Sequence, residues 1–119
     1  MISDERFSKK EHLLKTKDFS KVYKKGLAGR SDGVILYCLA NALEHNRLGF
    51  SIGSKNIKRA TSRNRIRRLL REVYRKLKGR LRSGFDLVIV VRKDISATIS
   101  YDSAAAAFLK LAKEAKFTT

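Results

Sequence analysis

Basic side chains at helical spacing are the chemically most informative feature of the sequence. Residues 55–82 hold thirteen Lys and Arg but one acidic residue, Glu72, so this window carries a net charge of +12 out of +17 for the chain. On a helix, four polar residues fall within about 60° of one another: Asn64, Arg68, Arg71 and Arg75. A solvated helix face usually mixes charges of both signs, and here only Glu72 can form i, i+4 pairs, with Arg68 or Lys76. Guanidinium groups bind phosphates through two hydrogen bonds and stack on bases, so this face predicts binding to nucleic acid.

Aromatic side chains among lysines form a second candidate site. Phe19 and Tyr23 are one helical turn apart in a segment, residues 15–25, that contains five lysines, and Tyr37 follows in a segment of strand character. Aromatic rings edged by cations stack on the bases of unpaired strands, which favours RNA over duplex DNA. The same spacing also fits an ordinary buried face, because Val22 lies on it, and both interpretations stay open on sequence alone.

No residue constellation indicates catalysis by the protein itself. His12 and His45 are isolated, and no carboxylate pair or triad has suggestive spacing. We expect Asp18, Asp86 and Asp94 to be cap or strand-end residues. Cys38 is the single cysteine and lies in an apolar run, which indicates a small buried side chain and excludes an intramolecular disulfide. Clustered thiols or paired histidines for a structural zinc site are also absent from the sequence.

Hydrophobic periodicity predicts the elements that position these residues. The expected order is a helix from Thr16 or Asp18 to Lys25, strands Val34–Ala40 and Arg47–Gly53, a helix from Asn56, Thr61 or Ser62 to about Lys78, a strand Phe85–Val91, and a helix capped at Ser100–Ser103. Gly26 is expected to end the first helix in a left-handed conformation. We expect the first two strands to pair as a hairpin and the long helix to cross over to the third.

This order predicts an α/β (α+β) two-layer sandwich with a mixed sheet of about four strands. Gly49, Ser51 and Gly53 alternate with apolar residues in the second predicted strand, so one face of this strand has almost no side-chain bulk. A bare face of this kind accepts either a closely packed helix or a ligand lying against the backbone.

Length and composition narrow the class of protein. The 119 residues fit a single domain, 1–119, and a net charge of +17 indicates a polyanionic partner. The charged N-terminal segment lacks the apolar stretch of a signal peptide, and the longest nearly charge-free run, residues 33–43, has about half the length that spans a bilayer. We therefore expect a cytoplasmic protein with no membrane partner.

The stretch from Arg47 to Glu72 resembles the signature of the bacterial ribonuclease P protein component, with Arg63, Asn64 and Arg65 matching its Arg-Asn-Arg motif. Further matching positions are Leu13-Leu14, Asp18-Phe19, Val22-Tyr23, Ile35–Tyr37 and Asp86–Val91. Three positions depart from the family pattern: Ser54 stands where a lysine is usual, His12 where an arginine is common, and Thr61 where valine or histidine is typical. Each departure weakens a local contact rather than the resemblance.

The resemblance implies a protein that assists a catalytic RNA. In that family a large RNA carries out the Mg²⁺-dependent hydrolysis that removes the 5′ leader from precursor tRNA, and the protein is its cofactor. The chain would then be the protein subunit of an endoribonuclease, with Mg²⁺ acting with the RNA subunit and no catalytic residue on the protein. The family fold is an α/β sandwich whose βαβ crossover is left-handed, which sequence alone does not suggest.

The resemblance also assigns two groups of residues. Contacts to the catalytic RNA are expected from Lys58, Arg59, Arg63, Asn64, Arg65, Arg67, Arg68, Arg71 and Arg75. The cleft that binds the leader of precursor tRNA is expected to contain Phe19, Tyr23, Tyr37, Ser51 and Lys55. No obligate protein partner is expected. Without the resemblance, a ribosomal or general RNA-binding protein is the main alternative, followed by a stand-alone nuclease and a sequence-specific DNA-binding protein.

Overall fold

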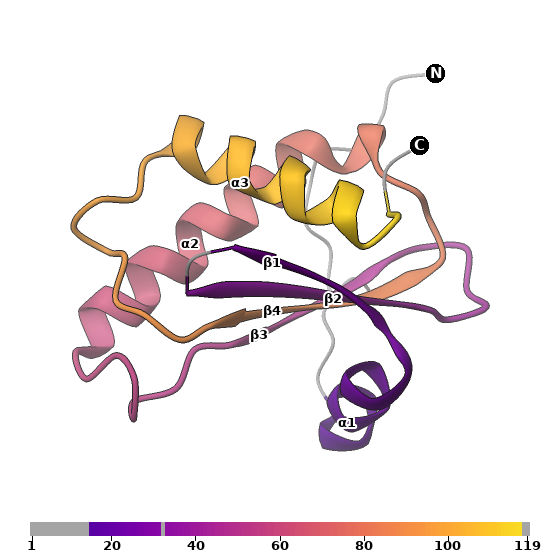
Figure 1. The fold of residues 1–119 in the computed structure, drawn as a ribbon, viewed down its shortest axis with the longest axis horizontal. Helices are drawn as coiled ribbons and strands as arrows, with labels where there is room; N and C mark the ends of the chain where they lie inside the picture. The colour runs from indigo at the N-terminus through magenta and orange to yellow at the C-terminus, as the bar shows by residue number, and fades with distance from the viewer. Residues whose placement is uncertain (1–14, 32, 118–119) are drawn as a thin grey trace.

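The computed structural model describes residues 15–31 and 33–117, which form a four-stranded sheet and three α-helices (Figure 1). In chain order the elements are α1 Thr16–Lys25, β1 Leu27–Ser31, β2 Val34–Ala40, β3 Arg47–Ser51, α2 Ala60–Leu77, a 3₁₀ turn Lys78–Arg80, β4 Phe85–Val91 and α3 Tyr101–Glu114. The predicted α+β fold with a mixed sheet is confirmed. His12 and the pair Leu13-Leu14 lie outside the described residues.

The strand order is β1-β2-β4-β3. β2 pairs with β1 and with β4, antiparallel in both cases, and β3 pairs in parallel with β4. The predicted hairpin between Val34–Ala40 and the strand that begins at Arg47 is therefore wrong, because β4 lies between these two strands. The crossover from β3 through α2 to β4 is present as predicted, and β1 is the strand that the sequence interpretation did not locate.

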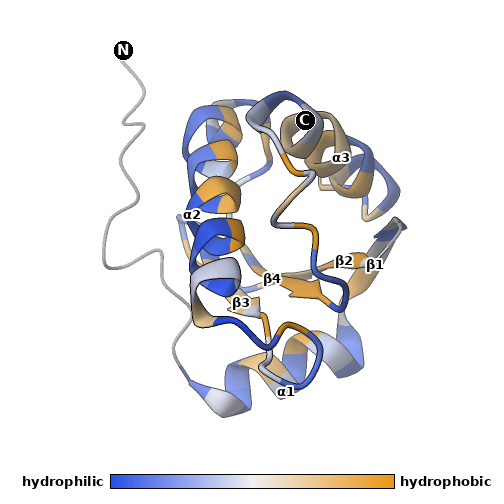
Figure 2. Ribbon diagram, turned by 90° about the vertical axis from the view of Figure 1, so that its left-hand side faces the viewer, coloured by the Kyte–Doolittle hydropathy of each residue, from blue (hydrophilic) through white to orange (hydrophobic). Residues whose placement is uncertain are grey.

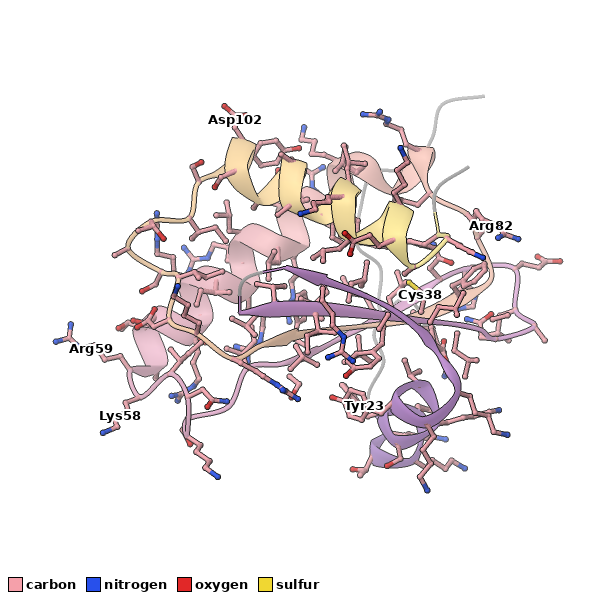
Figure 3. The ribbon with its side chains drawn as sticks, viewed as in Figure 1. Tyr23, Cys38, Lys58, Arg59, Arg82 and Asp102 are labelled. Atoms are coloured by element: carbon pink, nitrogen blue, oxygen red, sulfur yellow. The ribbon has the colours of Figure 1, made fainter. Side chains whose placement is uncertain are left out.

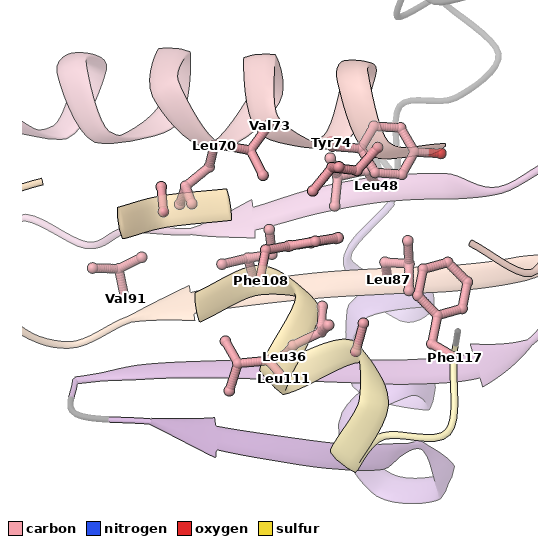
Figure 4. Close-up of a cluster of buried hydrophobic side chains, with 14 of the residues drawn as sticks. Leu36, Leu48, Leu70, Val73, Tyr74, Leu87, Val91, Phe108, Leu111 and Phe117 are labelled. Atoms are coloured by element: carbon pink, nitrogen blue, oxygen red, sulfur yellow. The ribbon is translucent and has the colours of Figure 1, made fainter. Parts of the chain in front are cut away.

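Helices cover the two faces of the sheet unequally. α2 and α3 lie on one face and α1 lies on the other, as Figures 1 and 2 show. The larger core, between the sheet and the helices α2 and α3, includes Leu36, Leu48, Tyr74, Phe108 and Phe117 (Figure 4). A smaller core under α1 consists of Val22, Ile35, Val88 and Val90. Because β4 is buried on both faces, it takes a central position in the sheet.

The helix ends agree only in part with the predicted caps. α3 begins with a capping box in which the side chains of Ser100 and Ser103 bond to each other's backbone N–H, as predicted. α1 and α2 begin after Lys15 and Arg59, and neither of these residues makes a side-chain capping bond. The predicted N-caps of these two helices are therefore wrong.

Gly26 ends α1 in an extended conformation, with φ −78° and ψ 156°, so the predicted left-handed stop is wrong. A glycine is required there for a different reason. A Cβ at this position would lie 2.6 Å from the carbonyl oxygen of Val22 and 2.8 Å from that of Cys38. The turn from α1 into β1 therefore passes against the backbone of β2.

The outer edge of β1 lies against α3. A Cβ at Gly29 would lie 2.3 Å from the carbonyl oxygen of Leu111, so only glycine permits this approach of helix and strand. The backbone N–H of Arg30 donates a 3.0 Å hydrogen bond to the Glu114 carboxylate at the end of α3. Strand and helix are thus connected by both packing and a hydrogen bond.

Candidate nucleic-acid interface

The basic face of α2 is positioned by the apolar stripe on the opposite side of the helix. Ile66, Leu70, Val73, Tyr74 and Leu77 are buried, and Figure 2 shows the hydrophobic side of α2 turned toward the interior. The opposite side carries a hollow of about 440 Å³, lined by Asn64, Arg67, Arg68, Arg71, Glu72 and Arg75. We call these six residues the arginine face. Since the helix is anchored by its stripe, the guanidinium groups project from a rigid support.

Contacts within the arginine face orient its side chains. Glu72 accepts two hydrogen bonds from Arg75, three residues ahead, at 3.2 Å from Nε and 2.6 Å from Nη2. The hydrogen bonds from Arg75 lower the pKa of the Glu72 carboxyl below its ordinary value. Arg67 donates a 3.1 Å hydrogen bond to Asn64, and the guanidinium carbon of Arg71 lies 5.7 Å from the centre of the Phe50 ring.

Arg63 and Arg65, predicted from the motif, also hold loops in place. Nη1 of Arg63 donates to the carbonyl oxygens of Ile57 and Lys58, at 2.7 and 3.0 Å, and so fixes the segment that enters α2. Nε of Arg65 donates to the carbonyl oxygen of Ser96, at 2.9 Å, in the loop after β4. Lys58 and Arg59 are exposed ahead of the helix, where Figure 3 shows their side chains extending outward.

A groove lies on the other face of the sheet, beside α1. It has a volume of about 460 Å³ and is lined by Tyr23, Tyr37, Ser51, Gly53, Asn56, Val90, Val91 and Arg92. The rings of Tyr23 and Tyr37 meet edge to face with their centres 5.1 Å apart. We call this the aromatic groove. Nothing lies within 4 Å of the position that a Cβ would take at Gly53, which follows the end of β3. The predicted bare face is therefore open at Gly53, whereas Gly49 is buried within β3.

The aromatic residues of α1 divide between core and surface. Val22 is fully buried, whereas Tyr23 keeps 39% of its surface exposed. Phe19 packs against the smaller core, with its ring centre 6.4 Å from that of Tyr23. Lys55 is exposed but is not among the described residues that line the groove. The structure thus brings together Tyr23, Tyr37 and Ser51, whereas Phe19 contacts Tyr23 but does not line the groove.

An ionic network that the sequence interpretation missed lies beside α1. Arg47 forms a bidentate pair with Asp86, from Nε to Oδ1 at 2.8 Å and from Nη2 to Oδ2 at 2.7 Å. Asn41 donates a further bond, at 2.9 Å, to Oδ1 of Asp86. Nη1 of Arg47 lies 3.7 Å from Oδ2 of Asp18 on α1. The buried carboxylate of Asp86 is therefore the centre of a partly buried network that joins β3, β4 and α1.

The described residues offer no group of three or more His, Cys, Asp or Glu side chains that could hold a metal ion. Side-chain nitrogen and oxygen atoms buried in the described part of the chain all have hydrogen-bond partners. Cys38 is buried in β2, and this burial raises the pKa of its thiol to about 12, which makes it a poor nucleophile.

A cationic helix and an aromatic groove on one small α+β fold define an RNA-binding protein. The family model described as Ribonuclease P matches residues 7–116. The chain therefore belongs to the family of bacterial ribonuclease P protein components. Proteins of this family are the protein subunit of the ribonucleoprotein that processes the 5′ end of tRNA, an endoribonuclease whose catalysis is carried by the RNA subunit.

Relatives and solved structures agree with this assignment. The ribonuclease P protein component of Caldanaerobacter subterraneus is 40% identical over 84 residues, covering 71% of this chain and 72% of its own length. The ribonuclease P protein component of Natranaerobius thermophilus is 35% identical over 104 residues, which cover 87% of this chain and 89% of its own length. A structure of the RNase P protein from Thermotoga maritima has a TM-score of 0.73 at 28% identity, covering 83% of this chain and 92% of its own. A structure of a Staphylococcus aureus RNase P protein mutant with defective mRNA degradation activity has a TM-score of 0.80 at 26% identity. The match covers 92% of this chain and 91% of that protein.

In the described part of the chain, no helix combines the length and the apolar character that crossing a membrane requires.

Proposed function

We propose that the protein binds two RNA molecules through two separate surfaces. The arginine face of α2, with Lys58, Arg59, Arg63 and Arg65 at its N-terminal end, contacts the catalytic RNA. The aromatic groove, with Phe19 behind it and Lys55 nearby, binds the single-stranded 5′ leader of precursor tRNA. The observation that carries this proposal is that the two surfaces lie on opposite faces of one sheet, so both can be occupied at once.

The chemistry of each surface suits its proposed partner. Guanidinium groups on a rigid helix bind phosphates of a folded RNA through paired hydrogen bonds. The exposed ring of Tyr23 and the half-buried ring of Tyr37 give unpaired bases of any sequence a surface to stack on, since every base has a π-face. By placing cations between two polyanions, the protein lowers the Mg²⁺ concentration needed for substrate binding and cleavage. Mg²⁺ acts with the RNA subunit, and the complex works in the cytoplasm without an obligate protein partner.

The division between the surfaces is tested with paired variants. Arg68→Ala with Arg71→Ala weakens assembly with a bacterial ribonuclease P RNA, and its matched control removes two exposed cations of α3, Lys110→Ala with Lys113→Ala. Tyr23→Ala spares assembly but weakens the binding of precursor tRNA that carries a leader. Its control is Tyr101→Ala, which removes an equally exposed tyrosine from the start of α3. Equal effects of both variant sets on both assays reject the division.

The first measurement is cleavage of precursor tRNA by a bacterial catalytic RNA at low Mg²⁺, with and without the protein, beside the protein alone. Cleavage at the mature 5′ end only when protein and RNA are both present supports the cofactor role. A folded protein that neither stimulates nor binds the RNA contradicts the proposal.

A further inference from the structure

Few side chains of α1 pack against the sheet. Val22 is the one buried residue among the ten of this helix, and the residue before the helix, Lys15, makes no side-chain capping bond. At its C-terminal end, the backbone N–H of Gly26 bonds to the carbonyl oxygen of Val22, and the chain turns against β2. In the first turn, Phe19 is only partly buried against the same small core, so an additional contact at this end would help to fix the rotation of the helix about its axis.

The ionic network supplies that contact. Asp18 lies in the first turn of α1, next to Phe19 and a little over one turn before Tyr23. Arg47 cannot move freely, because two of its nitrogens are bonded to the buried carboxylate of Asp86 in the central strand. The nitrogen that remains, Nη1, is the one that faces Asp18. A fixed point of the sheet thus holds the end of α1 that carries Phe19.

We propose that Arg47 is a positioning residue for RNA binding in the aromatic groove, acting through Asp18 to hold α1 so that Tyr23 faces Tyr37. This inference rests on the proposed function of the groove. Neither Arg47 nor Asp18 needs to touch RNA in this role.

For the substitution Asp18→Asn, a purely electrostatic effect and the loss of a positioning contact predict opposite changes in leader affinity. Asp18→Asn removes a negative charge close to the site of a polyanion, so electrostatics alone makes leader binding tighter. It also removes the attraction that Arg47 exerts on α1, so the positioning role makes leader binding weaker. The substitution leaves the pair between Arg47 and Asp86 intact, and the chain remains folded.

The experiment compares affinities for precursor tRNA with and without a leader, using the protein assembled with a bacterial ribonuclease P RNA. Asp18→Asn weakens the leader-dependent part of the affinity about two- to fivefold, as expected for a partly exposed ion pair. Asp18→Glu restores it, because a carboxylate again reaches Arg47. The matched control, Asp102→Asn, removes the same charge from the first turn of α3, far from the groove in Figure 3, and leaves the affinity unchanged.

The outcomes separate this inference from the proposed function. If Tyr23→Ala weakens leader binding but Asp18→Asn leaves it unchanged or strengthens it, the positioning role is refuted and the groove keeps its function. If Tyr23→Ala has no effect either, the proposed function of the groove fails. A loss of assembly with the RNA in Asp18→Asn, equal to its loss of leader affinity, indicates a general structural role and also overturns the inference.

Discussion

Replacing Gly26 by alanine tests how strongly the aromatic groove depends on the position of α1 against β2. The added Cβ would lie 2.6 Å from one backbone oxygen and 2.8 Å from another, and neither can rotate away. Ordinary contact begins at 3.4 Å, so the end of α1 must move about 0.6 Å away from β2 to relieve the contact with Cys38. Val22 belongs to α1 itself, so the last turn of the helix must also open to relieve the contact with its carbonyl oxygen. The backbone of Gly26 has angles that alanine adopts without strain, so the loss of stability comes from the clash and not from backbone strain.

We expect Gly26→Ala to lower the free energy of unfolding by about 2 kcal/mol, a usual cost of overpacking. For a chain of this size the melting temperature falls by about 8 °C, measured by calorimetry. Because α1 carries Tyr23, the displacement also weakens leader binding about fivefold, a part of the energy of stacking one base. Assembly with the catalytic RNA, through α2 on the other face of the sheet, stays unchanged.

Gly53→Ala is the matched control for stability, since a Cβ there meets nothing within 4 Å. Its melting temperature should equal that of the unsubstituted protein. A Gly26→Ala protein with an unchanged melting temperature would falsify the argument from close approach. Parallel losses of leader binding and RNA assembly would show that the displacement of α1 is not local to the groove.

Three further predictions concern single side chains. Burial raises the pKa of the Cys38 thiol to about 12, so the folded protein should resist iodoacetamide at pH 8 while the urea-unfolded chain reacts; similar reaction rates in both states would contradict this. Because the thiol ionises first in the unfolded chain, the free energy of unfolding should decrease above about pH 9. Hydrogen bonds from Arg75 lower the pKa of the Glu72 carboxyl, so this group should titrate below the ordinary range of a glutamate by NMR. The pairing should be lost only as the pH falls through that lowered pKa, and Arg75→Ala should move the midpoint back toward the ordinary range. Asp86→Ala leaves Arg47 without its bidentate acceptor and should lower the free energy of unfolding in urea by about 2–3 kcal/mol. A decrease of less than about 0.5 kcal/mol would show that water replaces the carboxylate as the partner of Arg47.

The elements with strong periodicity were predictable from the sequence. α2 follows from the i, i+3, i+4 stripe that includes Ile66 and Val73, and α3 begins at the predicted cap Ser100. The start of α2 was not predictable from cap residues, because no side chain caps it. Instead, Arg63 fixes the entering loop from within the helix, a contact that has no fixed sequence signature.

The strand order could not be obtained from local patterns. Asp32-Gly33 is a strong hairpin signal that would have indicated β1, and Gly33 has the positive φ, +74°, that such a turn requires. β4 lies between β2 and β3 because it pairs with residues about forty or more positions away in the sequence. The local hydrophobic pattern of a strand does not indicate such distant partners. The left-handed sense of the crossover stays a prediction from the family resemblance.

The candidate site was predictable where neighbours in sequence are neighbours in space. The arginine face follows from helical spacing, and Tyr23 with Tyr37 from aromatic residues among lysines. The network of Arg47, Asp86 and Asp18 was missed because its members come from three elements, with Arg47 and Asp86 separated by 39 positions. A charged residue at a strand end gives no sign of such a partner.

The contact of α3 with β1 has a consequence for solubility. An edge strand presents unpaired backbone groups that can recruit a strand from another chain, and proline is one common means of preventing this. This chain contains no proline. Instead, the Glu114 carboxylate occupies the outward N–H of Arg30, and the backbone of α3 lies against Gly29. A strand from a second molecule would have to displace the end of a helix before it could pair, so this edge of the sheet is protected against strand-to-strand aggregation.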